Sequence, residues 1–223
     1  MPEVLIGEGL EADPSAIIGY PSARIAAADL VIGPGARIRS GSVIYLGSRI
    51  GARLQTGHNV VIRENCEIGD DFSLWSNSVV DYSCRIAARV KIHTGCYVAQ
   101  FTEIDEDAFL APGVSVANDL YPGQDASARR MSGPHIGRGA QIGVNATLLP
   151  FVRIGAGALI GSGSVVTRDI PEGCVAFGNP ARVRGKVSDL LAIERRILPV
   201  PESASRYRLA IPDQGSAAGF TFP

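Results

Sequence analysis

We predict an all-β chain that winds into a coil of short parallel strands, because its aliphatic residues recur with a period of six. The first series runs from Ile32 to Val116 with Thr56 as its one exception, and a second series runs from Ile136 to Val166. Successive α-helical residues are about 100° apart, so six steps do not return to one face, whereas short strands joined by turns can keep this spacing. Aromatic residues make up 6% of the chain and glycine occurs 26 times, which indicates many tight turns rather than a thick aromatic core.

Two further columns share the period of six. The position four residues after each aliphatic residue is usually small or β-branched, with Leu54 and Phe72 as bulky departures. The position directly after the aliphatic residue is often glycine, at Gly33, Gly51, Gly57, Gly69, Gly137, Gly143, Gly155 and Gly161. We infer a triangular coil in which the aliphatic residue fills the interior, the small residue packs beside it, and a glycine-rich turn forms each corner.

Three hexads make one coil, so residues 18 apart in the sequence stack at about 4.8 Å. The two series hold 21 hexads, which predicts seven coils and a prism about 34 Å long. Cys66 and Cys84 are 18 residues apart and should stack inside the coil as small hydrophobic side chains.

The predicted coil domain spans residues 1–187. Residues 1–31 form a looser start, in which the period is present and then slips. Residues 188–223 leave the period, and we expect a short helix from Ser188 to Leu198 followed by an extended, proline-containing tail.

Composition and charge narrow the function classes. The chain has 223 residues and a net charge of −1, and no basic stretch indicates nucleic-acid binding. No apolar run is long enough to span a bilayer, and no signal-peptide pattern follows Met1, so no membrane association is expected. The four cysteines contain no C-x-x-C pair, and we expect a cytoplasmic protein with reduced thiols.

The residue before each inward aliphatic should point outward, which defines three outer faces. The first face alternates in charge, in the order Val31, Arg49, Glu67, Arg85, Glu103, His135 and Arg153. The second face is mixed, and the third is uncharged and largely apolar, in the order Val43, Val61, Val79, Tyr97, Ser115, Thr147 and Val165. A long apolar stripe predicts an interface with another copy, and burial under the C-terminal tail is the alternative.

One long insertion, residues 117–135, interrupts the coil between Val116 and Ile136. A loop of this length in so regular a fold is usually functional, although a tolerated insertion is the alternative. Gln100 lies 18 residues before Asn118, so the two amide side chains should stack at the same corner beside this loop.

The hexads of residues 30–187 resemble those of the left-handed β-helix acyltransferases. The resemblance implies a left-handed coil, where the general rule for parallel crossovers favours the right hand. It also implies a homotrimer with active sites between neighbouring coils, for which the third face is the expected contact.

The loop entrance L-A-P-G-V-S-V-A-N-D-L-Y-P, residues 110–122, looks like that of the nucleotide-sugar N-acyltransferases. That resemblance implies an acceptor amine on a sugar carried by dTDP or UDP. Galactoside and maltose O-acetyltransferases carry a Gly-His pair here, and this chain has Asn118 and Asp119 instead. A sugar hydroxyl needs a base to take its proton, whereas a neutral amine needs mainly alignment, which Asn118 can supply.

The candidate acceptor site therefore combines catalytic and substrate-binding residues. Asn118 and His93 are the catalytic candidates, with His93 as a possible base or a structural hydrogen-bonding group. Asp119, Gln100 and Tyr121 are the expected substrate-binding residues. The H-x-x-x-x-H pair of the γ-carbonic anhydrases, which use this fold with zinc, is absent, so no metal is expected.

The closing segment I-G-S-G-S-V-V-T-R-D-I-P-E-G-C-V-A-F-G-N-P-A-R-V, residues 160–183, resembles the coenzyme A end of the same family. The resemblance implies acetyl-CoA or another short acyl-CoA as donor. Its expected contacts are Gly143 and Gly161 against the pantetheine, Thr167 and Arg168 on the coenzyme, and Arg182, Arg184 and Lys186 near its phosphates. The alternative is that G-N-P-A merely ends the coil.

The interpretation is an acyl-CoA-dependent N-acyltransferase, with acetyl as the expected acyl group, acting on a nucleotide-linked amino sugar. An O-acetyltransferase of a sugar or small alcohol, with His93 as base, is the rival enzyme. A non-catalytic β-helix scaffold is the rival from another class, and the long loop and the coenzyme-like end argue against it. No Gly-rich Rossmann motif is present, so the nucleotide rests on resemblance alone.

Overall fold

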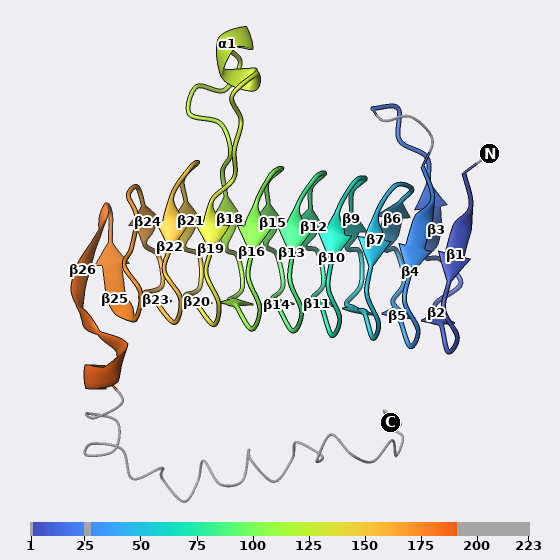
Figure 1. Cartoon of the computed structure of the whole chain (residues 1–223), viewed down its shortest axis with the longest axis horizontal. Coiled ribbons are helices and arrows are strands. Elements are labelled where there is room, and N and C mark those ends of the chain that lie inside the picture. The colour runs from blue at the N-terminus through green and yellow to red at the C-terminus, as the bar shows by residue number, and fades with distance from the viewer. Residues whose placement is uncertain (1, 25–27, 191–223) are drawn as a thin grey trace, which may run out of the picture. The chain divides into compact units, whose positions relative to one another are not determined.

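The computed structural model describes residues 2–24 and 28–190. The chain divides into a unit that ends at Val187 and a second unit, Ser188–Pro223. Apart from residues 188–190, the predicted C-terminal helix and tail lie outside the described residues. The coil itself is as predicted: three parallel sheets, which we call A, B and C in the order in which the chain visits them, form the sides of a β-helix (Figure 1).

Each sheet takes one strand from each turn of the coil. Sheet A contains β1 (Val4–Ile6), β4 (Leu30–Ile32), β7 (Arg49–Ile50), β10 (Glu67–Ile68), β13 (Arg85–Ile86), β16 (Glu103–Ile104), β19 (His135–Ile136) and β22 (Arg153–Ile154). Sheet B contains β2 (Glu11–Ala12), β5 (Arg37–Ile38), β8 (Gln55–Thr56), β11 (Ser73–Leu74), β14 (Lys91–Ile92), β17 (Phe109–Leu110), β20 (Gln141–Ile142), β23 (Leu159–Ile160), β25 (Cys174–Gly178) and β26 (Ala181–Lys186). Sheet C contains β3 (Ile17–Tyr20), β6 (Val43–Tyr45), β9 (Val61–Ile62), β12 (Val79–Val80), β15 (Tyr97–Val98), β18 (Ser115–Val116), β21 (Thr147–Leu148) and β24 (Val165–Val166).

The register between turns confirms the predicted stacking of residues 18 apart. Ile68 pairs with Ile86 on sheet A, and Val79 pairs with Tyr97 on sheet C. Sheet A has eight strands where the sequence predicted seven coils, because β1, β2 and β3 form one further turn. The period slips after this turn because residues 21–29 are inserted between β3 and β4.

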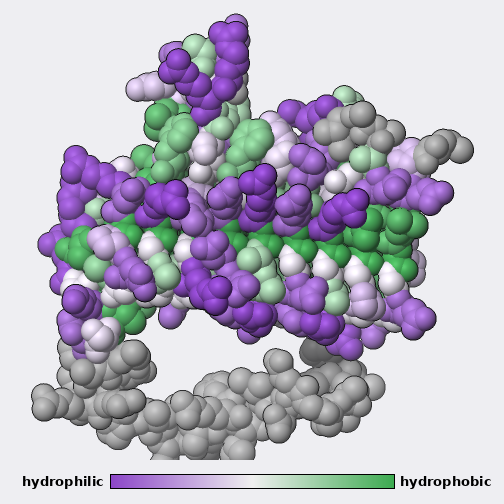
Figure 2. All heavy atoms as spheres, viewed as in Figure 1, coloured by the Kyte–Doolittle hydropathy of each residue, from purple (hydrophilic) through white to green (hydrophobic). Residues whose placement is uncertain are grey.

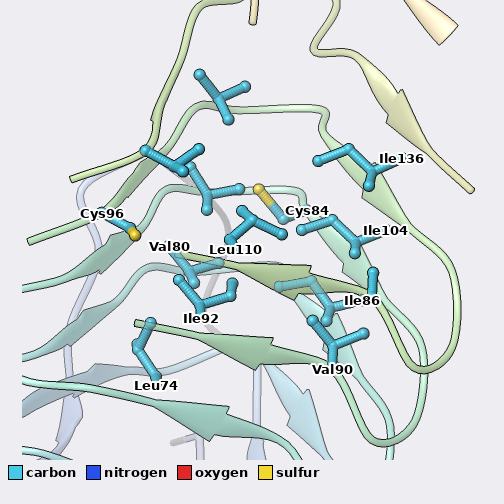
Figure 3. Close-up of a cluster of buried hydrophobic side chains, with 14 of the residues drawn as sticks. Leu74, Val80, Cys84, Ile86, Val90, Ile92, Cys96, Ile104, Leu110 and Ile136 are labelled. Atoms are coloured by element: carbon cyan, nitrogen blue, oxygen red, sulfur yellow. The ribbon is translucent and has the colours of Figure 1, made fainter. Parts of the chain in front are cut away.

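The interior contains the predicted aliphatic and small columns (Figure 3). Leu54 and Phe72, the two bulky departures, are both fully buried in the interior. Thr56 is also buried, and its Oγ1 accepts a hydrogen bond from Arg39 N at 2.9 Å, which satisfies the hydroxyl. Cys66 and Cys84 are buried free thiols, as predicted.

The glycine column has a different physical role from the one predicted. None of these corner glycines has a positive φ, and the left-handed residue lies two positions later, as at Gly35 (φ 73°), Asn77 (φ 60°) and Asp107 (φ 62°). A Cβ on Gly69 would lie 2.6 Å from Ala88 N in the next turn. The glycine column is therefore needed for close stacking of turns, and the left-handed position is filled by Gly, Asn, Asp and a few larger residues.

The two ends and the loops complete the described chain. The antiparallel pair β25–β26 closes sheet B, with β25 parallel to β23. The described residues after β3, 21–24, and the loop that carries α1 (Asp125–Ala128) both leave the coil at the end of a sheet C strand, and they project from the same edge (Figure 1). No helix among the described residues is long and apolar enough to cross a membrane.

We predict that Gly69→Ala destabilises the coil by about 1–3 kcal/mol, because the added methyl group meets the backbone of the next turn. Denaturant unfolding followed by circular dichroism measures the change. Gly185→Ala is the matched control, since a Cβ there meets nothing within 4 Å, and its effect should stay within about 0.5 kcal/mol. Equal stability of the two variants would contradict the stacking argument.

Candidate functional site

Most of the predicted site residues lie along two edges of sheet C, whereas Arg182 and Lys186 lie on β26 of sheet B. The B/C corner, between sheets B and C, carries His93, Gly143 and Gly161. The C/A corner, between sheets C and A, carries Gln100 and the α1 loop, and Thr167 and Arg168 follow β24 at its end. A single chain therefore places the candidate acceptor residues at one corner and the candidate base, His93, at the other, and it does not bring the two together.

The stacked amides at the C/A corner are in contact, as the spacing of 18 predicted. Asn118 Nδ2 donates a hydrogen bond to Gln100 Oε1 at 2.6 Å and also lies 3.4 Å from Met131 Sδ. Both partners are acceptors, which fixes the amide so that its nitrogen faces Gln100 and the loop. Among the described residues, no side chain or backbone group donates to Asn118 Oδ1, so this oxygen can accept a hydrogen bond from a ligand.

The loop that follows Asn118 is closed at its base and ordered by Asp119. Ser132 N donates to the backbone oxygen of Asn118 at 3.0 Å, which joins the two ends of the loop. Asp119 Oδ1 accepts from Tyr121 N at 3.0 Å and from the Ser127 hydroxyl. One oxygen of the predicted substrate-binding carboxylate is thus used to shape the loop.

Apolar side chains gather at the base of the same loop. Tyr121 is 62% exposed, and Leu120 and Phe151 are also exposed. These three residues, with Gln124, Ala126, Ser127 and Arg130, line a pocket between the loop and the coil. In Figure 2 the tip of the loop is hydrophilic and hydrophobic atoms lie where the loop meets the coil.

His93 lies in an aromatic setting at the B/C corner. Its ring centroid is 5.8 Å from that of Trp75 and 5.8 Å from that of Phe109. His93 Nδ1 is the single buried side-chain nitrogen or oxygen without a hydrogen-bond partner in the described part of the chain. An unpaired buried polar atom is costly unless a ligand or water satisfies it, which makes His93 the functional candidate among the histidines.

The other two histidines have structural partners. His58 Nδ1 lies 2.7 Å from Ser40 Oγ. His135 lies between Asp105, at 3.0 Å, and Arg153, at 2.9 Å, within the charged face of sheet A. Their hydrogen bonds explain both residues without a ligand.

The predicted coenzyme residues are exposed but widely spread. Thr167, Arg168, Arg182 and Lys186 all have exposed side chains at the last turns of the coil. Arg184 lies over the ring of Phe177, with its Cζ 5.5 Å from the centroid. A Cβ on Gly143 would lie 2.6 Å from Ser162 N, so stacking alone accounts for this glycine.

A charged cluster at the C/A corner was missed by the sequence analysis. Glu64 is fully buried and its carboxylate accepts two hydrogen bonds from the Arg63 guanidinium, at 2.9 and 3.1 Å. Asp81 accepts from Tyr97 Oη at 2.7 Å, and Arg63 lies over the Tyr45 ring at 4.9 Å. The signal was present in the columns after the sheet C strands, where charged and aromatic residues recur every 18 positions.

Burial disfavours the charged form of Glu64, but hydrogen bonds from Arg63, from the backbone and from Ser22 hold its pKa below the ordinary value of 4.5. The cluster lies along the same corner as the Gln100–Asn118 pair, in the turns that precede it. Within residues 2–24 and 28–190, no group of three or more His, Cys, Asp or Glu side chains could hold a metal ion.

The fold and the repeat together define the class of protein. Residues 133–168 match the family described as bacterial transferase hexapeptide (six repeats). The structure of LpxA, a UDP-N-acetylglucosamine acyltransferase from Bacteroides fragilis, aligns with a TM-score of 0.54 at 19% identity, over 96% of this chain and 83% of that one. The chain thus carries the hexapeptide repeat of bacterial transferases on a left-handed β-helix, and the predicted resemblance to the acyltransferases of this fold is confirmed.

Two curated proteins illustrate the sequence similarity. The bifunctional protein GlmU of Rubrobacter xylanophilus is 46% identical over 99 residues, which are 44% of this chain and 19% of that protein. The dTDP-3-amino-3,6-dideoxy-alpha-D-galactopyranose 3-N-acetyltransferase of Aneurinibacillus thermoaerophilus is 52% identical over 50 residues, 22% of this chain and 26% of that protein. The chain spans well under half the length of the curated relatives that it matches.

We predict that Glu64→Gln destabilises the protein by about 1–3 kcal/mol at neutral pH, because it removes the buried charge that Arg63 binds. Since folding lowers the pKa of Glu64, the stability this group contributes is present above its unfolded pKa and is lost as the pH falls through its folded pKa. The difference between wild type and variant should therefore shrink in acid. Glu67→Gln, at an exposed pair with Arg85, is the control and should have no measurable effect at any pH in denaturant titrations.

Proposed function

We propose that this protein is an acyl-CoA-dependent N-acyltransferase that acetylates the amino group of a dTDP- or UDP-linked amino sugar. The observation that carries the proposal is the amide pair at the C/A corner. Asn118 Nδ2 is held by Gln100 Oε1, which leaves Asn118 Oδ1 as an acceptor beside the loop. An acceptor oxygen matches an amine nucleophile, which has protons to donate and a lone pair to aim.

The reaction requires that a neutral acceptor amine be aligned with the thioester of the donor. The nitrogen lone pair attacks the thioester carbonyl carbon, the carbon–sulfur bond breaks, and the departing thiolate receives the proton that the amine loses. The products are an amide and free coenzyme A. Asn118 Oδ1 orients one N–H of the nucleophile, and His93, with its unpaired ring nitrogen, is proposed to assist the transfer of the proton without being required for it.

The donor is proposed to lie along the B/C corner. At the position directly after each sheet B strand, successive turns carry His93, Ala111, Gly143 and Gly161, so this column holds nothing larger than a methyl group between His93 and β25. The exposed Arg182, Arg184 and Lys186 of β26 offer positive charge for the coenzyme phosphates at the far end. The similarity to a dTDP-amino-sugar 3-N-acetyltransferase supports a nucleotide-linked amino sugar as the acceptor and acetyl as the transferred group.

A homotrimer would complete this site. If sheet C of each copy faces a threefold axis, the B/C corner of one copy meets the C/A corner of the next. His93 and the glycines would then come from one copy, and Asn118, Gln100, Thr167 and Arg168 from its neighbour. The outward side chains of sheet C support this contact, because Val43, Val61 and Val79 are uncharged and only half-buried in the single chain.

An O-acetyltransferase is the second candidate, and the His93 ring favours it. An unpaired imidazole nitrogen in an aromatic setting is suited to act as a general base toward a hydroxyl. The two candidates differ in which residue is required, and that difference can be measured.

We predict that Asn118→Ala lowers the rate of N-acetylation by a factor of about 10 to 1000, since misplacement of a reactant alone can cost about 10². His93→Ala should cost much less on the same amine. The measurement is turnover of a panel of dTDP- and UDP-amino sugars, and of their hydroxyl counterparts, with acetyl-CoA. Turnover of hydroxyl substrates alone, abolished by His93→Ala, would establish the O-acetyltransferase instead, because loss of a general base typically costs roughly 10²–10⁴.

We predict that the wild type sediments at three times its 23.4 kDa chain mass and that Val61→Glu dissociates it. A charge buried at the sheet C contact without a partner costs several kcal/mol. Val31→Glu is the matched control, because it makes the same change at an outward position of sheet A and should leave the trimer intact. A monomeric wild type would refute the assembly.

A further inference from the structure

Trp75 stands at the N-terminal end of the corner that the donor is proposed to follow. The pairing of β11 with β14 places Trp75 one turn before His93, and the pairing of β8 with β11 places Gly57 one turn before Trp75. Trp75 is 42% exposed, and its ring centroid lies 5.8 Å from that of His93. Its indole is therefore a bulky group that stands between His93 and a residue with no side chain.

The direction of the donor follows from the positions along this corner. Four turn-to-turn steps separate Phe177, next to the cationic β26, from His93, which is about 19 Å at the spacing of stacked strands. A coenzyme whose phosphates lie at β26 and whose arm extends along Gly161, Gly143 and Ala111 presents its thioester near His93. The acyl chain then continues in the same direction, toward Trp75.

We propose that Trp75 closes the acyl end of the donor site and restricts the donor to short acyl groups such as acetyl. This inference rests on the proposed function, because it requires coenzyme A on the B/C corner. Trp75 is a specificity-determining residue in this view, and it takes no part in proton transfer. An acetyl group ends before the indole, whereas each further methylene must displace the ring or leave the corner.

The experiment measures donor binding and needs no acceptor. Calorimetry gives the Kd of coenzyme A, acetyl-CoA and hexanoyl-CoA for the wild type, Trp75→Ala and Trp75→Phe. We expect hexanoyl-CoA to bind the wild type at least tenfold more weakly than acetyl-CoA, and Trp75→Ala to reduce that ratio about tenfold or more, since one methylene alone is worth about 10-fold or more in a fitted pocket. Trp75→Phe should give an intermediate ratio, and coenzyme A itself should bind all three proteins equally.

Phe109→Ala is the matched control. Phe109 also contacts His93, but it points outward from sheet B in the turn after His93 and so lies on the coenzyme side of the reacting group. Its removal should leave the ratio of the two acyl-CoA affinities unchanged. A similar change of ratio in Phe109→Ala and Trp75→Ala would refute a specific role for Trp75.

The single tryptophan supplies an independent readout. Trp75 is the one tryptophan in the sequence, so the intrinsic indole fluorescence of the protein reports on this position alone. Acetyl-CoA should change that fluorescence more than coenzyme A does, because the acetyl group ends next to the indole, whereas the thiol of coenzyme A stops farther from it. Tight binding of all three ligands with no change in fluorescence, and an unchanged ratio in Trp75→Ala, would overturn the inference while leaving the donor site in place. Failure of the wild type to bind coenzyme A at all would instead overturn the proposed donor, and Trp75 would then have no such role.

Discussion

The close stacking of one turn of the coil on the next is the constraint on which the rest of this structure depends. Backbone N–H groups of each turn donate to carbonyl groups of the following turn, for example from Gly51 N to Ile68 O and from Gly69 N to Ile86 O, each at 2.8 Å. These bonds hold the register at 18 residues and leave no space for a Cβ at the corner glycines. A repeat of this kind gains stability from each neighbouring turn, so its regularity is a condition of folding.

This constraint decides where chemistry can be placed. Inward positions are needed for packing, and outward strand positions lie on flat sheets, so the corners and the loops that leave them are the places for functional side chains. The chain leaves the C/A corner twice, after β3 and at the α1 loop. The aromatic side chains around His93 lie at the B/C corner, and the amide side chains of Gln100 and Asn118 lie at the C/A corner. The uncharged face of sheet C lies between them. That face separates two halves of one candidate site, and the separation itself is the physical argument for a neighbouring copy.

Ion pairs at different corners of the coil contribute differently to its stability. The ion pairs of the corner between sheets A and B, such as Arg53 with Asp71 at 2.6 Å and Arg89 with Asp107 at 2.7 Å, join exposed side chains on adjacent turns. Exposed pairs of this kind are worth roughly 0–1 kcal/mol, so they contribute little beyond solubility and register. The Arg63–Glu64 pair is different because Glu64 is fully buried, and losing Arg63 would leave its carboxylate buried without a paired charge.

The sequence by itself determined the repeat, the interior columns, the three faces and the pairing of Gln100 with Asn118, because a period of 18 converts sequence position directly into spatial position. It also indicated where the coil is interrupted. It could not show which way the Asn118 amide is oriented, because that depends on its contact with Met131. It also could not show that a ring nitrogen of His93 is unpaired, because that depends on the packing of Trp75 and Phe109 around the ring. Tertiary structure also decided the role of the corner glycines, since only the distance to the next turn reveals that stacking, and not a left-handed backbone, requires them.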